Sequence, residues 1–115
     1  MTVTEALEKL KSYEQTSFAL SHAMGLLYYD GVTAAPKGAA AVRSDTTGEL
    51  SRIDYQLTTA PDTVEMLETL MAARTELDAV TRRKVEEYWR SYDRTRRIPE
   101  EEFVAYQKLT TRADD

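Results

Sequence analysis

The segment from Phe18 to Tyr29 places the strongest constraint on how this 115-residue chain can fold. It carries no charge, and at 100° per residue its apolar side chains cover most of the circumference of a helix. These side chains are Phe18, Leu20, Ala23, Met24, Leu26, Leu27, Tyr28 and Tyr29. A helix that is apolar on every side has to be covered on every side. The rest of the chain is short, so we expect protein outside this chain to cover part of that surface.

The hydrophobic pattern predicts about five helices and no strand, so the expected fold class is an all-α antiparallel bundle. The first helix is expected from about Val3 to Tyr29, with a capping box at its start and Asp30-Gly31 at its end. The connection after it contains Pro36-Lys37-Gly38. Further helices are expected at about 39–58, 63–74, 79–97 and from Pro99 onward. We interpret residues 1–115 as one α-helical domain.

Apolar residues at helical spacing predict the face that each helix buries. The first helix has a one-sided stripe up to Tyr13, before the stripe widens. The stripes expected in the next four helices are, in order, Val42, Leu50, Ile53 and Leu57; Val64, Leu67, Leu70 and Met71; Val85, Tyr88, Trp89 and Tyr92; and Phe103, Tyr106 and Leu109.

Composition excludes several classes of protein. The absence of cysteine rules out disulfides, cysteine-ligated zinc and a thiol nucleophile. The charge-free stretch from Gln15 to Tyr29 is shorter than the roughly 20 residues of a membrane-spanning helix, and acidic residues precede it, unlike in a signal peptide. We therefore expect a soluble, cytoplasmic protein with no membrane partner.

The chain contains no recognisable catalytic or metal site. His22 is the one histidine, and Ala19 stands where a Glu-x-x-His metal motif would need glutamate, so we interpret His22 as a half-buried, hydrogen-bonded residue. Ser21, Ser44 and Ser51 lack the second histidine or buried acid that would make a nucleophile. We predict that the chain has no catalytic residue and no metal ligand.

A basic cluster is the sharpest local feature. Seven of the fifteen cations fall within residues 82–97, although the whole chain has a net charge of −5. Four of them share one helical face opposite Val85 and Tyr92 and are the candidate contact for a partner or a substrate groove: Arg83, Arg90, Arg94 and Arg97.

Three possible i, i+4 ion pairs favour a solvated, salt-bridged face for this cluster: Arg83–Glu87, Glu86–Arg90 and Asp93–Arg97. Contact with protein or substrate is the second interpretation. A stripe that follows phosphates is the third, and the acidic balance of the chain argues against it. We therefore expect no nucleic-acid partner.

Two stretches resemble one family. The run Leu20-Ser21-His22-Ala23-Met24-Gly25-Leu26-Leu27-Tyr28-Tyr29-Asp30, followed by Thr33, Pro36, Ala39 and Arg43, is similar to the N-terminal region of the M32 zinc metallocarboxypeptidases of the Taq type. That region has a leucine-rich helix ending in Ser-Trp-Asp, and Tyr29 stands where the family often has tryptophan. The stretch from Val85 to Ala113 is also similar, because residues 92–101 resemble the family's basic helix with the Leu/Ile-Pro-Glu-Glu that follows it, and a helix with Thr-x-Arg-Ala comes next.

The resemblance implies an N-terminal fragment of a larger, groove-shaped, all-helical peptidase. Such an enzyme removes C-terminal residues from peptides with zinc or another divalent metal, and its His-Glu-x-x-His helix comes later in the sequence. The chain would then be a wall or lid of the substrate groove, inactive alone, with the parent's catalytic domain and a peptide substrate as partners. Isolated, it is expected to form a homo-oligomer that buries its uncovered surface.

The alternative is a stand-alone α-helical protein-interaction module that ends naturally at Asp115. Its partner would contact the face formed by Arg83, Arg90, Arg94 and Arg97.

Overall fold

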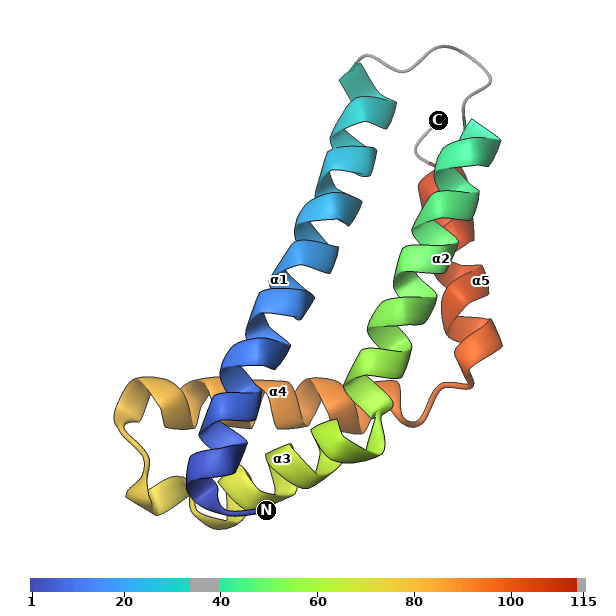
Figure 1. Ribbon diagram of the computed structural model, residues 1–115. Helices are drawn as coiled ribbons and strands as arrows, with labels where there is room; N and C mark the ends of the chain where they lie inside the picture. Colours follow the sequence, from blue (N-terminus) through green and yellow to red (C-terminus); the bar gives the residue numbers. More distant parts are fainter. Residues whose placement is uncertain (34–39, 114–115) are drawn as a thin grey trace. The chain divides into compact units, whose positions relative to one another are not determined.

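The computed structural model describes residues 1–33 and 40–113, and the regular structure in these ranges is helical (Figure 1). The helices are α1 (Val3–Thr33), α2 (Ala40–Thr59), α3 (Pro61–Ala72), the short 3₁₀ helix η1 (Arg74–Glu76), α4 (Ala79–Thr95) and α5 (Glu100–Ala113). The described ranges contain no strand, so the predicted all-α class is confirmed. The predicted connection at Pro36-Lys37-Gly38 lies outside the described residues.

The predicted end of the first helix is wrong, because α1 continues through Asp30-Gly31 to Thr33. A glycine inside a helix costs about 1 kcal/mol relative to alanine, which is too little to end a helix of 31 residues. The other boundaries agree within two residues, and α3 begins at Pro61, where a missing backbone N–H is tolerated.

Side-chain caps begin two of the helices. At the start of α1, the Glu5 backbone N–H donates to Thr2 Oγ1 at 3.1 Å and the Thr2 backbone N–H donates to Glu5 Oε1 at 3.2 Å. This is the predicted capping box. At the start of α4, Asp78 Oδ1 accepts from the Thr81 backbone N–H at 2.8 Å. This hydrogen bond holds the pKa of the Asp78 carboxyl below its usual value.

The chain forms two compact units. Unit 1 comprises residues 1–15 and 56–97, and unit 2 comprises residues 16–55 and 98–115. Helices α1 and α2 each contribute one part to unit 1 and another part to unit 2.

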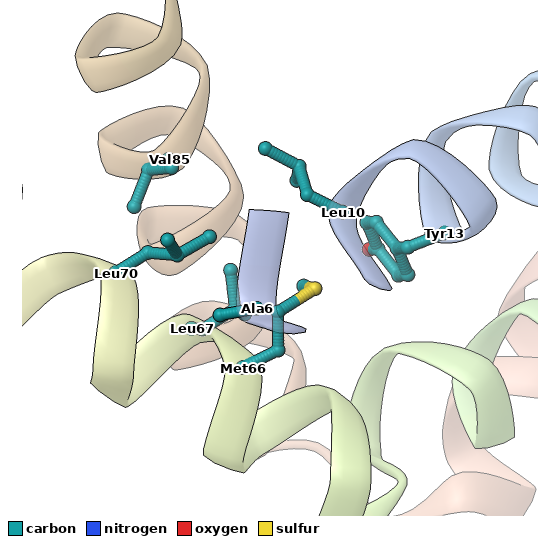
Figure 2. Packing of buried hydrophobic residues seen from close by; sticks show 7 residues of the cluster. All are labelled: Ala6, Leu10, Tyr13, Met66, Leu67, Leu70 and Val85. Atoms are coloured by element: carbon teal, nitrogen blue, oxygen red, sulfur yellow. The ribbon is translucent and has the colours of Figure 1, made fainter. Parts of the chain in front are cut away.

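Unit 1 contains a conventional apolar core. Figure 2 shows that seven buried side chains from α1, α3 and α4 gather there: Ala6, Leu10, Tyr13, Met66, Leu67, Leu70 and Val85. Half-buried residues packed against them include Leu57, Tyr88, Trp89 and Tyr92. The stripes predicted for the third and fourth helices therefore lie against this core.

Unit 2 packs α5 on α2 through small residues. Ser44 Oγ donates to the Lys108 backbone carbonyl at 2.9 Å. A Cβ placed on Gly48 would lie 2.7 Å from Lys108 Cγ and 3.5 Å from Val104 Cγ1. A larger residue at position 48 would require the Lys108 side chain to shift, so glycine favours the close approach of α5.

A second set of contacts joins the start of α5 to the end of the α2 segment in unit 2. The Arg52 guanidinium donates to the Glu101 carboxylate, which lowers the pKa of Glu101. Tyr55 Oη donates to the Ile98 carbonyl at 2.6 Å, and the Tyr55 and Phe103 rings lie 5.4 Å apart. Together these contacts hold the N-terminal turn of α5 against α2.

The predicted packing face of α2 is wrong within unit 2. Val42 is 69% exposed and Ile53 is 49% exposed, whereas the buried α2 positions of this unit are Arg43, Ser44, Thr47 and Ser51. Short hydroxyl side chains allow a neighbouring helix to come close and can hydrogen-bond to it, as Ser44 does.

The prediction for the packing face of α5 is correct for half-buried Phe103 and wrong for its exposed Tyr106 and Leu109.

Candidate functional site

Helix α4 holds the predicted basic residues on one solvent-facing side. Val85 is fully buried, and Tyr88, Trp89 and Tyr92 pack against the unit 1 core. This anchoring fixes how α4 is rotated about its own axis. The opposite face consequently presents three of the four arginines predicted from sequence, all exposed: Arg83, Arg90 and Arg94. The fourth, Arg97, is also exposed but follows the end of α4 at Thr95.

Asp93 takes part in the ion pairs on this part of α4. Its carboxylate oxygens lie 2.8 Å from an Arg96 nitrogen and 3.1 Å from an Arg97 nitrogen. These two guanidinium groups hold the pKa of Asp93 below its usual value, with the Arg96 hydrogen bond contributing most. The predicted Asp93–Arg97 pair is thus confirmed.

The other two predicted pairs are wrong. Within the part of the chain that the structure describes, neither Arg83–Glu87 nor Glu86–Arg90 forms an ion pair. An exposed ion pair contributes at most about 1 kcal/mol, which is too little to hold two long side chains together reliably. The surface is solvated as expected, but it is only partly neutralised by its own carboxylates.

A hollow of about 440 Å³ on this surface is lined by Glu87, Arg90, Asp93 and Arg94. Arg90 and Arg94 are one helical turn apart, so their guanidinium groups flank the same space. Two such groups can bind a carboxylate or phosphate by charge-assisted hydrogen bonds. The carboxylates of Glu87 and Asp93 line the same hollow, and Asp93 is already paired with Arg96 and Arg97, so Arg90 and Arg94 are the groups there that an anion could contact.

A polar network that sequence reasoning missed links α1 to α4 inside unit 1. Glu14 Oε2 accepts a hydrogen bond from Tyr88 Oη at 3.3 Å and forms an ion pair with Lys84 Nζ, also at 3.3 Å. The Tyr88 ring lies edge-on to Tyr13 at 5.2 Å, and the Tyr13 and Thr58 hydroxyls share a hydrogen bond at 3.5 Å. Burial, reinforced by the Glu14 charge, raises the pKa of Tyr88 to about 12. The phenol stays protonated and acts as a structural donor.

His22 differs from its predicted role. Its side chain is exposed, and its ring stacks on Phe18 at 6.1 Å, so the half-buried, hydrogen-bonded interpretation is wrong. Among the described residues, no three histidine, cysteine, aspartate or glutamate side chains are grouped as a metal site would require. Ser44 and Ser51 direct their hydroxyls to the Lys108 carbonyl and to Met24 Sδ.

Exposed apolar side chains concentrate in unit 2. Nine of the eleven large apolar residues found exposed in the described ranges belong to it: Phe18, Leu26, Tyr28, Tyr29, Val42, Ile53, Ile98, Tyr106 and Leu109. Ile98 and Tyr106 also line a largely apolar hollow of about 470 Å³ together with Glu102, Phe103 and Gln107.

None of the described helices combines the length and hydropathy needed to cross a membrane.

The chain also matches a protein-family model. The model describes the carboxypeptidase Taq (M32) metallopeptidases and aligns with residues 9–115. This chain belongs to the M32 peptidase family. The family resemblance seen in the sequence is thereby confirmed.

A curated relative of this M32 chain is Carboxypeptidase 1 of Bacillus subtilis (strain 168). The two are 27% identical over 113 residues, which cover 92% of this chain and 23% of the relative. The M32 chain therefore spans about a quarter of the length of that protein. No solved structure matches it significantly.

Proposed function

We propose that this M32 chain is the N-terminal helical region of a metal-dependent carboxypeptidase that removes C-terminal residues from peptides. In that enzyme it forms a wall or lid of the substrate groove. Membership of the family supports the peptidase activity. The chain covers 23% of the Bacillus relative, which supports placing the catalytic residues in protein beyond this chain.

The observation that carries the proposal is the uncovered apolar surface of unit 2. Phe18 and Leu109 are 73% and 67% exposed, whereas only two of the eleven exposed large apolar residues in the described ranges, Met1 and Val80, belong to unit 1. Covering one large apolar side chain contributes about 1.5–3 kcal/mol. A surface with nine such residues is the expected interface of a helical wall with the catalytic part of the same enzyme.

The metal is expected to be bound outside this chain. The family implies a divalent cation, zinc or another, in the full-length enzyme. The described side chains do not fit such a site, because they include no group of three potential ligands and His22 stacks on Phe18. The isolated chain is accordingly proposed to be inactive.

Paired aspartate substitutions in the full-length enzyme test this interface. Leu109 in unit 2 and Val80 in unit 1 are each 67% exposed in this chain. We expect Leu109→Asp to lower the melting temperature and the carboxypeptidase activity, since it places a charge in the interface, and Val80→Asp to leave both unchanged. Equal effects of the two substitutions would contradict the proposed role of unit 2.

The native gene and the isolated chain provide a second test. The coding frame beyond the Asp115 codon should encode a His-Glu-x-x-His helix, and a stop codon there would refute the proposal. The isolated chain should self-associate in light scattering and bind a hydrophobic dye such as ANS. A monodisperse monomer without dye binding would count against an uncovered interface.

A further inference from the structure

The exposed face of α4 carries three arginines that its own carboxylates leave unneutralised. Among the described residues, Arg83, Arg90 and Arg94 have no ion-pair partner, although glutamates occur within one helical turn of Arg83 and Arg90. Three neighbouring cations are paired: Lys84 of α4 pairs with Glu14, and Arg96 and Arg97, which follow the end of α4, pair with Asp93. Arg82 also has no ion pair among the described residues, but it is half-buried and lies about 100° around the helix from Arg83. The exposed unpaired arginines of α4 therefore share one face.

We propose that this face, formed by Arg83, Arg90 and Arg94, binds an acidic α-helix of a partner protein. The proposal goes beyond the peptidase role and does not depend on it. The partner's carboxylates form ion pairs with the arginines. Two of these carboxylates contact Arg90 and Arg94 at the hollow of about 440 Å³.

The spacing of the three arginines sets the spacing of the partner's carboxylates. At a rise of 1.5 Å per residue, Arg90 and Arg94 are about 6 Å apart along the axis, and Arg83 lies about 10 Å beyond Arg90. All three fall within about 40° of one another around α4. An antiparallel helix with acidic residues at i, i+4 and i+11 presents three carboxylates at the same intervals on one face.

The charges around this face favour a protein helix over a nucleic acid as its partner. Glu87 lies within the stripe and is exposed, so a continuous phosphate backbone would pass directly over a carboxylate. The chain as a whole also carries a net charge of −5. Separate carboxylates one and two turns apart meet the arginines without lying on Glu87. Asp93 does not repel them strongly because Arg96 and Arg97 already neutralise it.

The rigidity of α4 supports its use as a binding surface. Val85 is fully buried, the Trp89 and Tyr92 rings are in contact at 5.5 Å, and the Asp78 cap closes the helix start. The backbone that carries the arginines is therefore ordered before the partner arrives, which reduces the entropy lost on binding.

Fluorescence anisotropy with designed peptides tests the proposal. The probe is a labelled, alanine-rich 20-residue peptide with glutamates at i, i+4 and i+11. Its control is a scrambled peptide of the same composition, with the glutamates on different faces. We expect the chain to bind the probe more tightly than the control, with an affinity that falls as salt is raised, since exposed charges are screened over about 8 Å at physiological ionic strength. Equal binding of the two peptides would overturn the proposal.

Charge reversal identifies the surface. Arg90→Glu with Arg94→Glu should weaken probe binding about tenfold or more, because two attractive contacts become repulsive. The matched control, Lys11→Glu with Arg74→Glu, changes the net charge equally at exposed positions of unit 1 outside α4 and should change the affinity less than about twofold. Loss of binding in the control would refute the assignment of the binding surface to α4. Tighter binding of a single-stranded DNA oligonucleotide than of the probe would refute the protein partner.

Unchanged circular dichroism of both variants verifies that they fold. The pair Arg90→Gln with Arg94→Gln repeats the test without added negative charge.

Discussion

Leu67→Ala should remove a large part of the stability of unit 1. Leu67 lies in α3 with no exposed surface, within the cluster formed by α1, α3 and α4. Shortening a fully buried leucine to alanine costs about 2–5 kcal/mol, because the lost contacts leave a cavity that neighbours fill incompletely. We expect about 3 kcal/mol here.

The size of unit 1 makes this loss severe. Unit 1 contains 57 residues. At roughly 0.05–0.15 kcal/mol per residue, its free energy of unfolding is about 3–9 kcal/mol. The substitution should therefore remove between about one third and all of that stability.

Urea unfolding measures the effect with two signals. Trp89 is the only tryptophan and packs against the unit 1 core, so its fluorescence reports on unit 1, while circular dichroism reports on all helices. With a slope of about 1–2 kcal/mol/M, the fluorescence midpoint should fall by about 1.5–3 M. Val80→Ala is the control, because shortening a 67% exposed side chain of the same unit should alter stability by less than about 0.5 kcal/mol.

Two results would refute this reasoning. One is a loss below about 1 kcal/mol for Leu67→Ala with an unchanged slope, which would mean that the α3 side chains do not form the core of unit 1. The other is a loss for Val80→Ala as large as that for Leu67→Ala, which would mean that burial in this structure does not distinguish the two sites.

Three further predictions concern α5, a buried phenol and an exposed ion pair. Gly48→Val should speed amide hydrogen exchange in α5 but not in α3, because its Cβ would lie 2.7 Å from a side-chain carbon of Lys108; equal change in both helices would contradict this. Tyr88→Phe should abolish the tyrosine ionisation seen by ultraviolet absorbance at about pH 12. The stabilising effect of the neutral phenol should be complete below about pH 10 and decline as the pH rises from 10 to 12, and an ionisation persisting in the variant would refute the assignment. Asp62, whose pKa is lowered chiefly by the hydrogen bond from Lys9, stabilises the fold above its ordinary pKa of 3.8 and loses this effect as the pH falls further. Asp62→Asn should therefore lower the urea midpoint near pH 7 and leave it unchanged near pH 2; a constant difference would exclude the ion pair as the cause.

Much of the fold could be predicted from local pattern. The capping box at Thr2 and Glu5 and the stripes around Leu67 and Val85 correctly indicated a helix start and two packing faces. These features depend on residues three or four positions apart, which helical geometry alone brings together. The α1 end at Asp30-Gly31 failed because a weak local penalty was outweighed by the rest of the helix.

The candidate site was predictable in position but not in chemistry. Helical spacing placed Arg83, Arg90 and Arg94 on one exposed face, and the structure agrees. Spacing could not decide which cations would be neutralised, since each exposed pair contributes too little energy to fix a long side chain. The sequence does contain small and hydroxyl residues on the packing face of α2, at Ser44, Gly48 and Ser51. The prediction overlooked them because it followed the larger apolar residues of the same helix.

By itself, the sequence determined the helical class, the lack of cysteine chemistry, the basic face of α4 and the resemblance to the M32 family. All four depend on composition or on the order of residues close together in the chain. Only the tertiary structure decided that unit 1 buries an apolar core while unit 2 packs α5 against Ser44 and Gly48. It also decided that Phe18 and His22 are exposed. The physical reason is that burial depends on which distant helix covers a face, and an apolar stripe indicates only that some partner is required.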